Sequence, residues 1–205
     1  LGLAVAHMQA LVLPLAGGFI LIAPLAAVGL YEMSRCLEEG RPATWRQVLT
    51  AGLRARGQLG FFGGILAFAL FAWLQLALLL FMLLWGSNGI PPPSAFVSTL
   101  LFTPHGLALL VIGTAVGGVL ASIVFAISVI SVPLLMTRQF DAVTAARASL
   151  HAVALNPQPL ALWAALIAGF MAVGIATLSV GLIVAFPLIG HATWHAYRAL
   201  VRQTP

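Results

Sequence analysis

Two histidines four residues apart form the pattern in this sequence that is most typical of a chemical site. His191 and His195 lie in the stretch from Gly190 to Arg198. On a helix, this spacing places both imidazoles on one face, where they could bind a metal ion. The stretch contains no cysteine or carboxylate to complete a ligand set, and the sequence has no HExxH motif. We therefore expect both histidines to pack or hydrogen-bond, with metal or haem binding as the alternative.

The other groups that could do chemistry are scattered along the chain. His7 and His105 fall near the same predicted membrane face, where a haem between two helices is the alternative to simple packing. His151 lies in a polar segment, and Cys36 is the single cysteine, which rules out an intramolecular disulfide. Glycine-rich phosphate loops are absent from the sequence. We expect no catalytic, cofactor-binding or metal-binding residue, and no enzyme.

The composition indicates that lipid surrounds most of the chain. Of 205 residues, 62% are hydrophobic and 6% are charged, whereas a soluble domain carries about 25% charged residues. Nine arginines and four acids cannot cover a globule of this size in water. The net charge of +5 does not predict nucleic-acid binding, because the arginines lie in short stretches between apolar runs. That arrangement is typical of cytoplasmic loops in membrane proteins.

The apolar runs predict five to six membrane crossings. We interpret residues 15–35 as one complete helix and residues 1–12 as the end of a helix whose beginning is missing, with one long tilted helix as the alternative. Further crossings are expected over 59–86 and 105–136. The run 158–201 is long enough to cross twice, with a turn near Ala176–Ser179.

The run 105–136 is too long for an upright helix. Gly117-Gly118 and Pro133 are the candidate positions for a kink.

The charged segments predict the orientation of the protein. Residues 32–58, 137–157 and 198–205 are expected in the cytoplasm of a bacterium, and the uncharged stretch 87–104 is expected as a connection on the periplasmic side of the inner membrane.

Two of the charged segments predict amphipathic helices at the cytoplasmic interface. One begins with the capping-box sequence Thr44–Gln47. The other has an apolar side formed by Phe140, Val143, Ala146, Leu150 and Val153.

Small residues recur four positions apart in two of the crossings. The pairs are Gly60 with Gly64, Gly113 with Gly117, and Gly118 with Ser122. In lipid this spacing allows helices to approach closely. Packing within the chain is one interpretation, and docking to a partner subunit is the other.

Two longer stretches resemble a known bacterial family. Phe19 to Pro24, followed by Gly29 to Arg35, resembles one hallmark of domain of unknown function 2189, a family described as predicted integral membrane proteins, and Pro187 to Arg198 resembles another. The segments Asp141–Ala148 and Asn156-Pro157 fit as well. The resemblance implies six crossings. Some members are labelled as cytochrome c oxidase components, but this sequence lacks the haem-copper histidine pattern, so accessory association is the most that the label implies.

Together these patterns predict an all-α, polytopic transmembrane bundle, one domain over residues 1–205, with two interfacial helices. We expect an accessory or scaffold subunit of a larger membrane complex, respiratory or otherwise energy-transducing, with lipid and other membrane subunits as its partners and no nucleic acid. The alternative is a transporter or channel for a neutral or lipidic solute, because helices broken by proline and glycine can line binding sites. An enzyme with a histidine-held metal is the third possibility.

Overall fold

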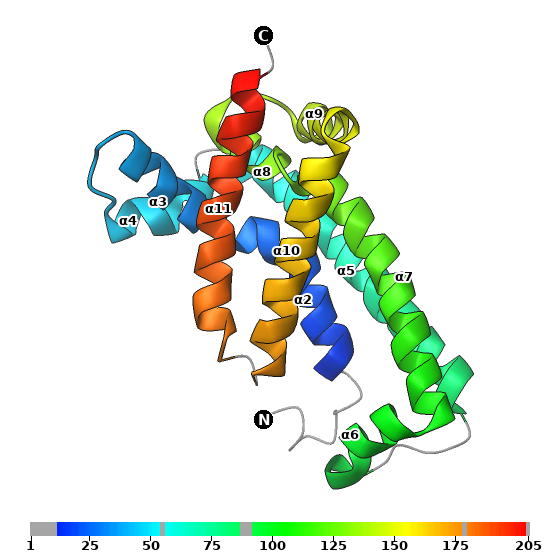
Figure 1. Cartoon of the computed structure of the whole chain (residues 1–205). Helices are drawn as coiled ribbons and strands as arrows, with labels where there is room; N and C mark the ends of the chain where they lie inside the picture. Colours follow the sequence, from blue (N-terminus) through cyan, green and yellow to red (C-terminus); the bar gives the residue numbers. More distant parts are fainter. Residues whose placement is uncertain (1–11, 54–55, 87–91, 178–179, 204–205) are drawn as a thin grey trace.

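The computed structural model describes residues 12–53, 56–86, 92–177 and 180–203, and every element within those ranges is helical (Figure 1). This confirms the all-α class. In chain order the elements are α2 (Val12–Ala26), α3 (Val28–Glu38), α4 (Trp45–Thr50), the 3₁₀ turn η2 (Ala51–Leu53), α5 (Arg56–Trp85), α6 (Pro93–Phe102), α7 (Pro104–Ser128), α8 (Ser131–Thr137), α9 (Ala142–Leu155), α10 (Pro157–Ala176) and α11 (Leu182–Gln203).

Four helical stretches in the described residues are long and apolar enough to cross a membrane. They are Gly18–Glu38, Arg56–Trp85, Pro104–Thr137 and Pro157–Ala176. The expected turn near residues 176–179 is present, because α10 ends at Ala176 and α11 then runs back beside it (Figure 1). Nearly all of the predicted partial helix over 1–12 lies outside the described residues.

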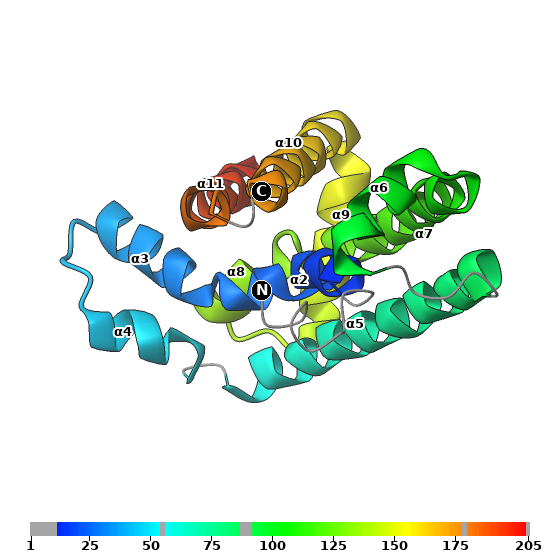
Figure 2. The same cartoon turned by 90° about the horizontal axis from the view of Figure 1, so that it is seen from below.

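The helix expected over 15–35 is divided at Ala27. Figure 2 shows α2 nearly end-on and α3 running sideways from it toward α4. The composition of α3 accounts for this course, since Glu32, Ser34 and Arg35 would be costly to place in hydrocarbon. Because α3 runs sideways, these polar groups stay at one level along the long axis of the bundle.

The predicted kink in the long run 105–136 occurs between α7 and α8. Helix α7 passes through Gly117-Gly118 without a break and ends at Ser128, and α8 begins at Ser131. Pro133 explains the position, because it lacks the N–H that would bond to the carbonyl of Val129, and its ring would collide with that carbonyl.

The charged segments gather toward one end of the bundle. Helices α8 and α9 and the C-terminal end of α11 lie there, whereas α6 lies at the opposite end (Figure 1). The connection over 87–104 contains α6, which starts at Pro93 in the first helical position, where a missing N–H costs nothing.

The apolar side predicted for the second amphipathic helix packs only in part, through Ala146 and Val153, which lie against the core. Helix α9 buries Ala142, Ala145 and Ser149 against the bundle. Val143 and Leu150 stay 56% and 46% exposed, in positions that lipid would cover. Small side chains allow the α9 backbone to approach its neighbours, which favours them at the contact. The first capping box is confirmed, because Thr44 and Gln47 bond reciprocally at the start of α4.

The hydrophobic core lies in the half of the bundle that carries the charged segments. Its fully buried members include Phe62 and Leu66 of α5, Val132 of α8 and Trp194 of α11. Few residues of α10 are buried, and α10 packs mainly on α11. The opposite half of the bundle is therefore more open.

Candidate functional site

The predicted histidine stretch forms a polar contact between α3 and α11. Ser34 Oγ lies 2.6 Å from His191 Nδ1. Glu38 accepts a hydrogen bond at 3.1 Å from Nε1 of Trp194, one turn further along α11, and another at 3.0 Å from Nε of Arg198, two turns further along. These contacts join segments that are more than 150 residues apart in sequence. Their arrangement satisfies polar groups at a helix junction, and of the two histidines only His191 takes part in these three contacts.

A small pocket of about 450 Å³ opens beside this contact and is lined by Ser34, Leu37, Glu38, His191 and His195. His195 is exposed at its edge. Among the described residues, no group of three or more His, Cys, Asp or Glu side chains is close enough to hold a metal ion.

The remaining histidines do not come together with this pair. His105 is exposed at the start of α7, and His151 is exposed on α9. The prediction for His7 falls on a residue outside the described part of the chain.

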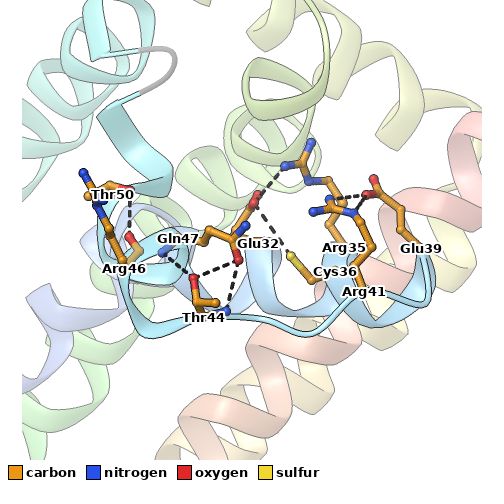
Figure 3. A network of polar contacts seen from close by, with 9 residues as sticks. All are labelled: Glu32, Arg35, Cys36, Glu39, Arg41, Thr44, Arg46, Gln47 and Thr50. Atoms are coloured by element: carbon orange, nitrogen blue, oxygen red, sulfur yellow. Dashed lines mark hydrogen bonds and ion pairs between the residues drawn. The ribbon is translucent and has the colours of Figure 1, made fainter.

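A buried carboxylate was missed by the sequence analysis. Glu32 is 1% exposed and pairs with Arg35 at 2.8 Å, with Cys36 Sγ 3.9 Å away (Figure 3). The residue had been assigned to a solvated cytoplasmic segment. The three-residue spacing of Glu32 and Arg35 predicts an ion pair on one helix face, but burial depends on the sideways course of α3.

The turn after α3 is held by exposed polar contacts, also drawn in Figure 3. Arg41 donates to Glu39, and this hydrogen bond lowers the pKa of the Glu39 carboxyl. Thr44 and Gln47 follow with their capping box. These contacts fix the direction of the chain from α3 into α4 and need no ligand to explain them.

A second and larger cavity, of about 850 Å³, lies between α2, α5, α6, α7 and α10. Aromatic rings of α5 (Trp73, Phe81 and Trp85) line one side, and small residues of α7 and α10 line the other. None of the described lining residues is charged. The described lining therefore offers no acid–base group and is almost entirely apolar.

The position of Trp73 is fixed by two contacts. Its indole N–H donates to the carbonyl of Pro14 at 2.8 Å. Its ring packs on Gly117, where an added Cβ would lie 2.8 Å from the ring. Gly117 therefore allows close packing within the chain. Gly113 and Gly118 also line the cavity, but a Cβ added at either position would meet no described atom within 4 Å.

Sequence reasoning did not identify this cavity. The signal was the density of small residues on α7 and on α10, for example Ala164, Ala165, Ala168 and Ala172. A face of small residues predicts close packing when a neighbouring helix reaches it. Here α10 stays near α11 instead, and the small residues leave space.

Comparison with known proteins supports the same class. A family model described as predicted integral membrane protein (DUF2189) matches residues 12–137. The chain belongs to this family. The hallmark over Phe19–Arg35 lies inside the matched range, and the resembling stretch over Pro187–Arg198 lies beyond it. No curated protein and no solved structure matches the chain.

Proposed function

We propose that this integral membrane protein is non-catalytic and binds a neutral, apolar molecule, such as a lipid chain, in the cavity between α5, α7 and α10. The single observation that carries the proposal is the cavity itself. Its volume of about 850 Å³ falls in the range of about 300–1,000 Å³ typical of small-molecule sites. A water molecule in this cavity would form few hydrogen bonds, because few polar groups line it.

The location of the cavity favours a molecule that arrives from the bilayer. Its lining runs along α5 from Trp73 to Trp85, within a helix that is apolar and long enough to cross a membrane. Thr114 and Ser122 supply its hydroxyl groups, and Ser122 already donates to the carbonyl of Gly118. Transfer of a lipidic solute is the corresponding activity, as for the transporter alternative predicted from the sequence.

A matched pair of variants tests the proposal. Gly113→Phe fills the cavity, whereas Gly169→Phe places the same ring on α10 at an exposed glycine outside the lining. Native mass spectrometry of protein extracted in a mild detergent would show the mass of any bound molecule. We expect the wild type and Gly169→Phe to retain an apolar molecule and Gly113→Phe to lose it, with equal helix content by circular dichroism. An empty wild type, or equal retention by all three proteins, contradicts the proposal.

A second candidate function is an accessory or scaffold subunit of a larger complex in a bacterial inner membrane, respiratory or otherwise energy-transducing. The observation that favours it is that two of the crossings are little buried by the rest of the described chain. Only 6% of the most apolar window of Arg56–Trp85 and 17% of that of Pro157–Ala176 are buried, against 50% for Pro104–Thr137. Such helices leave faces for neighbouring subunits.

Extraction of native membranes, followed by a native gel, mass spectrometry and a haem absorption spectrum, tests this second candidate. Reproducible co-migration with electron-transfer subunits supports it, and a solitary colourless band counts against it.

A further inference from the structure

Helix α5 has one packed face and one free face. Leu59, Phe62 and Leu66 are buried against the bundle. The opposite face is exposed along the helix and includes Gly60, Gly64, Phe68, Phe71, Gln75 and Leu79. The spacing of these residues, three or four apart, keeps them on one stripe. Among the described residues, a Cβ added at Gly60 or at Gly64 meets nothing within 4 Å.

Gln75 is the polar side chain at the centre of this stripe. It lies nine residues beyond the buried Leu66, which is two and a half helical turns and therefore the opposite side of α5. Its amide makes no hydrogen bond with any described residue, and it does not line the cavity.

The depth of Gln75 follows from the helix rise. Gln75 precedes Trp85, the last residue of α5, by ten residues, or about 15 Å along the axis. The hydrocarbon core is about 30 Å thick, and tryptophan favours its edges. With Trp85 at the edge, Gln75 lies near the middle of the bilayer. A primary amide that faces lipid tails there loses the hydrogen bonds it would make with water.

The chemistry of the amide indicates what covers this face. A glutamine side chain carries both donors and an acceptor, so it pairs with its own copy. Two molecules of one membrane protein insert with the same orientation, so a two-fold axis along the membrane normal brings identical residues together at identical depth. A carboxylate or guanidinium at this position would repel its copy, whereas an amide bonds to it. Phe68 and Phe71 flank the amide on one side, and Leu79 and Met82 flank it on the other.

We propose that two copies of this chain associate through the free face of α5, with the two Gln75 amides hydrogen-bonded to each other at mid-membrane. Gly60 and Gly64 lie on the same stripe, nearer the charged end, and allow the two backbones to approach. The association does not depend on what the cavity binds.

The first test is the monomer–dimer equilibrium of the whole chain in lipid bilayers, measured by energy transfer between differently labelled copies at increasing lipid dilution. We expect Gln75→Leu to weaken dimerisation by about threefold to thirtyfold, because it removes the paired amides, and Gln75→Asn to retain most of it. Gly64→Leu should weaken it as well, through steric bulk. Equal dimerisation of the wild type and Gln75→Leu, or a wild type that stays monomeric at every dilution, overturns the proposal.

A second test does not require any variant to lose stability. In a Cys36→Ser background, Phe71→Cys places a thiol on the free face, and Leu80→Cys places one on the opposite face, which lines the cavity. Oxidation in membranes should join two copies through Cys at position 71 and not at position 80. If Phe71→Cys instead cross-links to a different protein while the purified chain remains monomeric, a foreign subunit covers α5 and the self-association is wrong.

Discussion

Replacement of Gly190 by alanine should weaken the docking of α11 on α3. Gly190 is buried, and a Cβ at this position would lie 2.5 Å from Cδ1 and 3.0 Å from Cβ of Leu30. The Cδ1 atom can rotate away, but the Leu30 Cβ moves only with the backbone of α3. Overpacking of this kind costs about 1–3 kcal/mol, and alanine recovers about 0.5–1 kcal/mol over glycine inside a helix. We therefore expect a net loss of roughly 0.5–2 kcal/mol in unfolding free energy.

The matched control is Gly169→Ala, because Gly169 is exposed on α10 and a Cβ there meets nothing described within 4 Å. It should leave the unfolding free energy unchanged or raise it slightly. Adding Leu30→Ala to Gly190→Ala removes the Cγ and Cδ1 contacts, so the double variant should be more stable than the sum of the two single changes predicts. The assay is SDS-induced unfolding in mixed micelles, followed by circular dichroism and tryptophan fluorescence. The reasoning is refuted if Gly190→Ala is as stable as Gly169→Ala.

Two further predictions concern polar contacts at the charged end of the bundle. Thr137 Oγ1 lies 2.7 Å from Tyr197 Oη and links α8 to α11. A double-mutant cycle with Thr137→Val and Tyr197→Phe should give a coupling free energy of about 1 kcal/mol. Additive effects of the two substitutions would show that the hydrogen bond does not form. Asp141 caps α9 by accepting from the hydroxyl and backbone N–H of Thr144, and these bonds lower the pKa of its carboxyl. Because the native pKa lies below the unfolded one, this stabilisation is present above about pH 4 and is lost as the pH falls through the native value. Asp141→Ala should therefore destabilise the protein at pH 7 and have little effect at pH 2 to 3, and an equal effect at both pH values, in urea unfolding followed by circular dichroism, would contradict this origin.

The sequence was sufficient to predict the membrane class, the main helices and the turn between α10 and α11. The length of an apolar run and the position of the charges at its ends are properties of a single segment. Each segment could therefore be interpreted without knowing its neighbours in the fold. The interruptions were harder to predict. Pro133 marked one of them, but the sideways turn at Ala27 reflects where polar residues of α3 find partners on α11, such as His191 for Ser34.

What depended on tertiary arrangement was not predicted. The fully buried residues of α9 are Ala142, Ala145 and Ser149, and a hydrophobic periodicity does not distinguish them from the larger apolar residues beside them, of which Val143 and Leu150 stay exposed. The cavity is likewise a property of several helices at once, since small residues leave a space only where the opposing helix stands apart. Gln75 was visible in the sequence, but its significance follows from the side of α5 on which the bundle packs.

The most direct test of the proposed function is photolabelling in native-like bilayers with a lipid that carries a diazirine near the middle of its acyl chain, with modified residues located by peptide sequencing. The account predicts label inside the cavity, on lining residues such as Trp73 and Ala168, as well as on Val119 of α7, which is exposed and does not line the cavity. Gly113→Phe should abolish label at the lining residues and leave label at Val119 unchanged. Two results would contradict the account: labelling of only outward-facing residues in the wild type, or labelling of the lining residues that persists in Gly113→Phe.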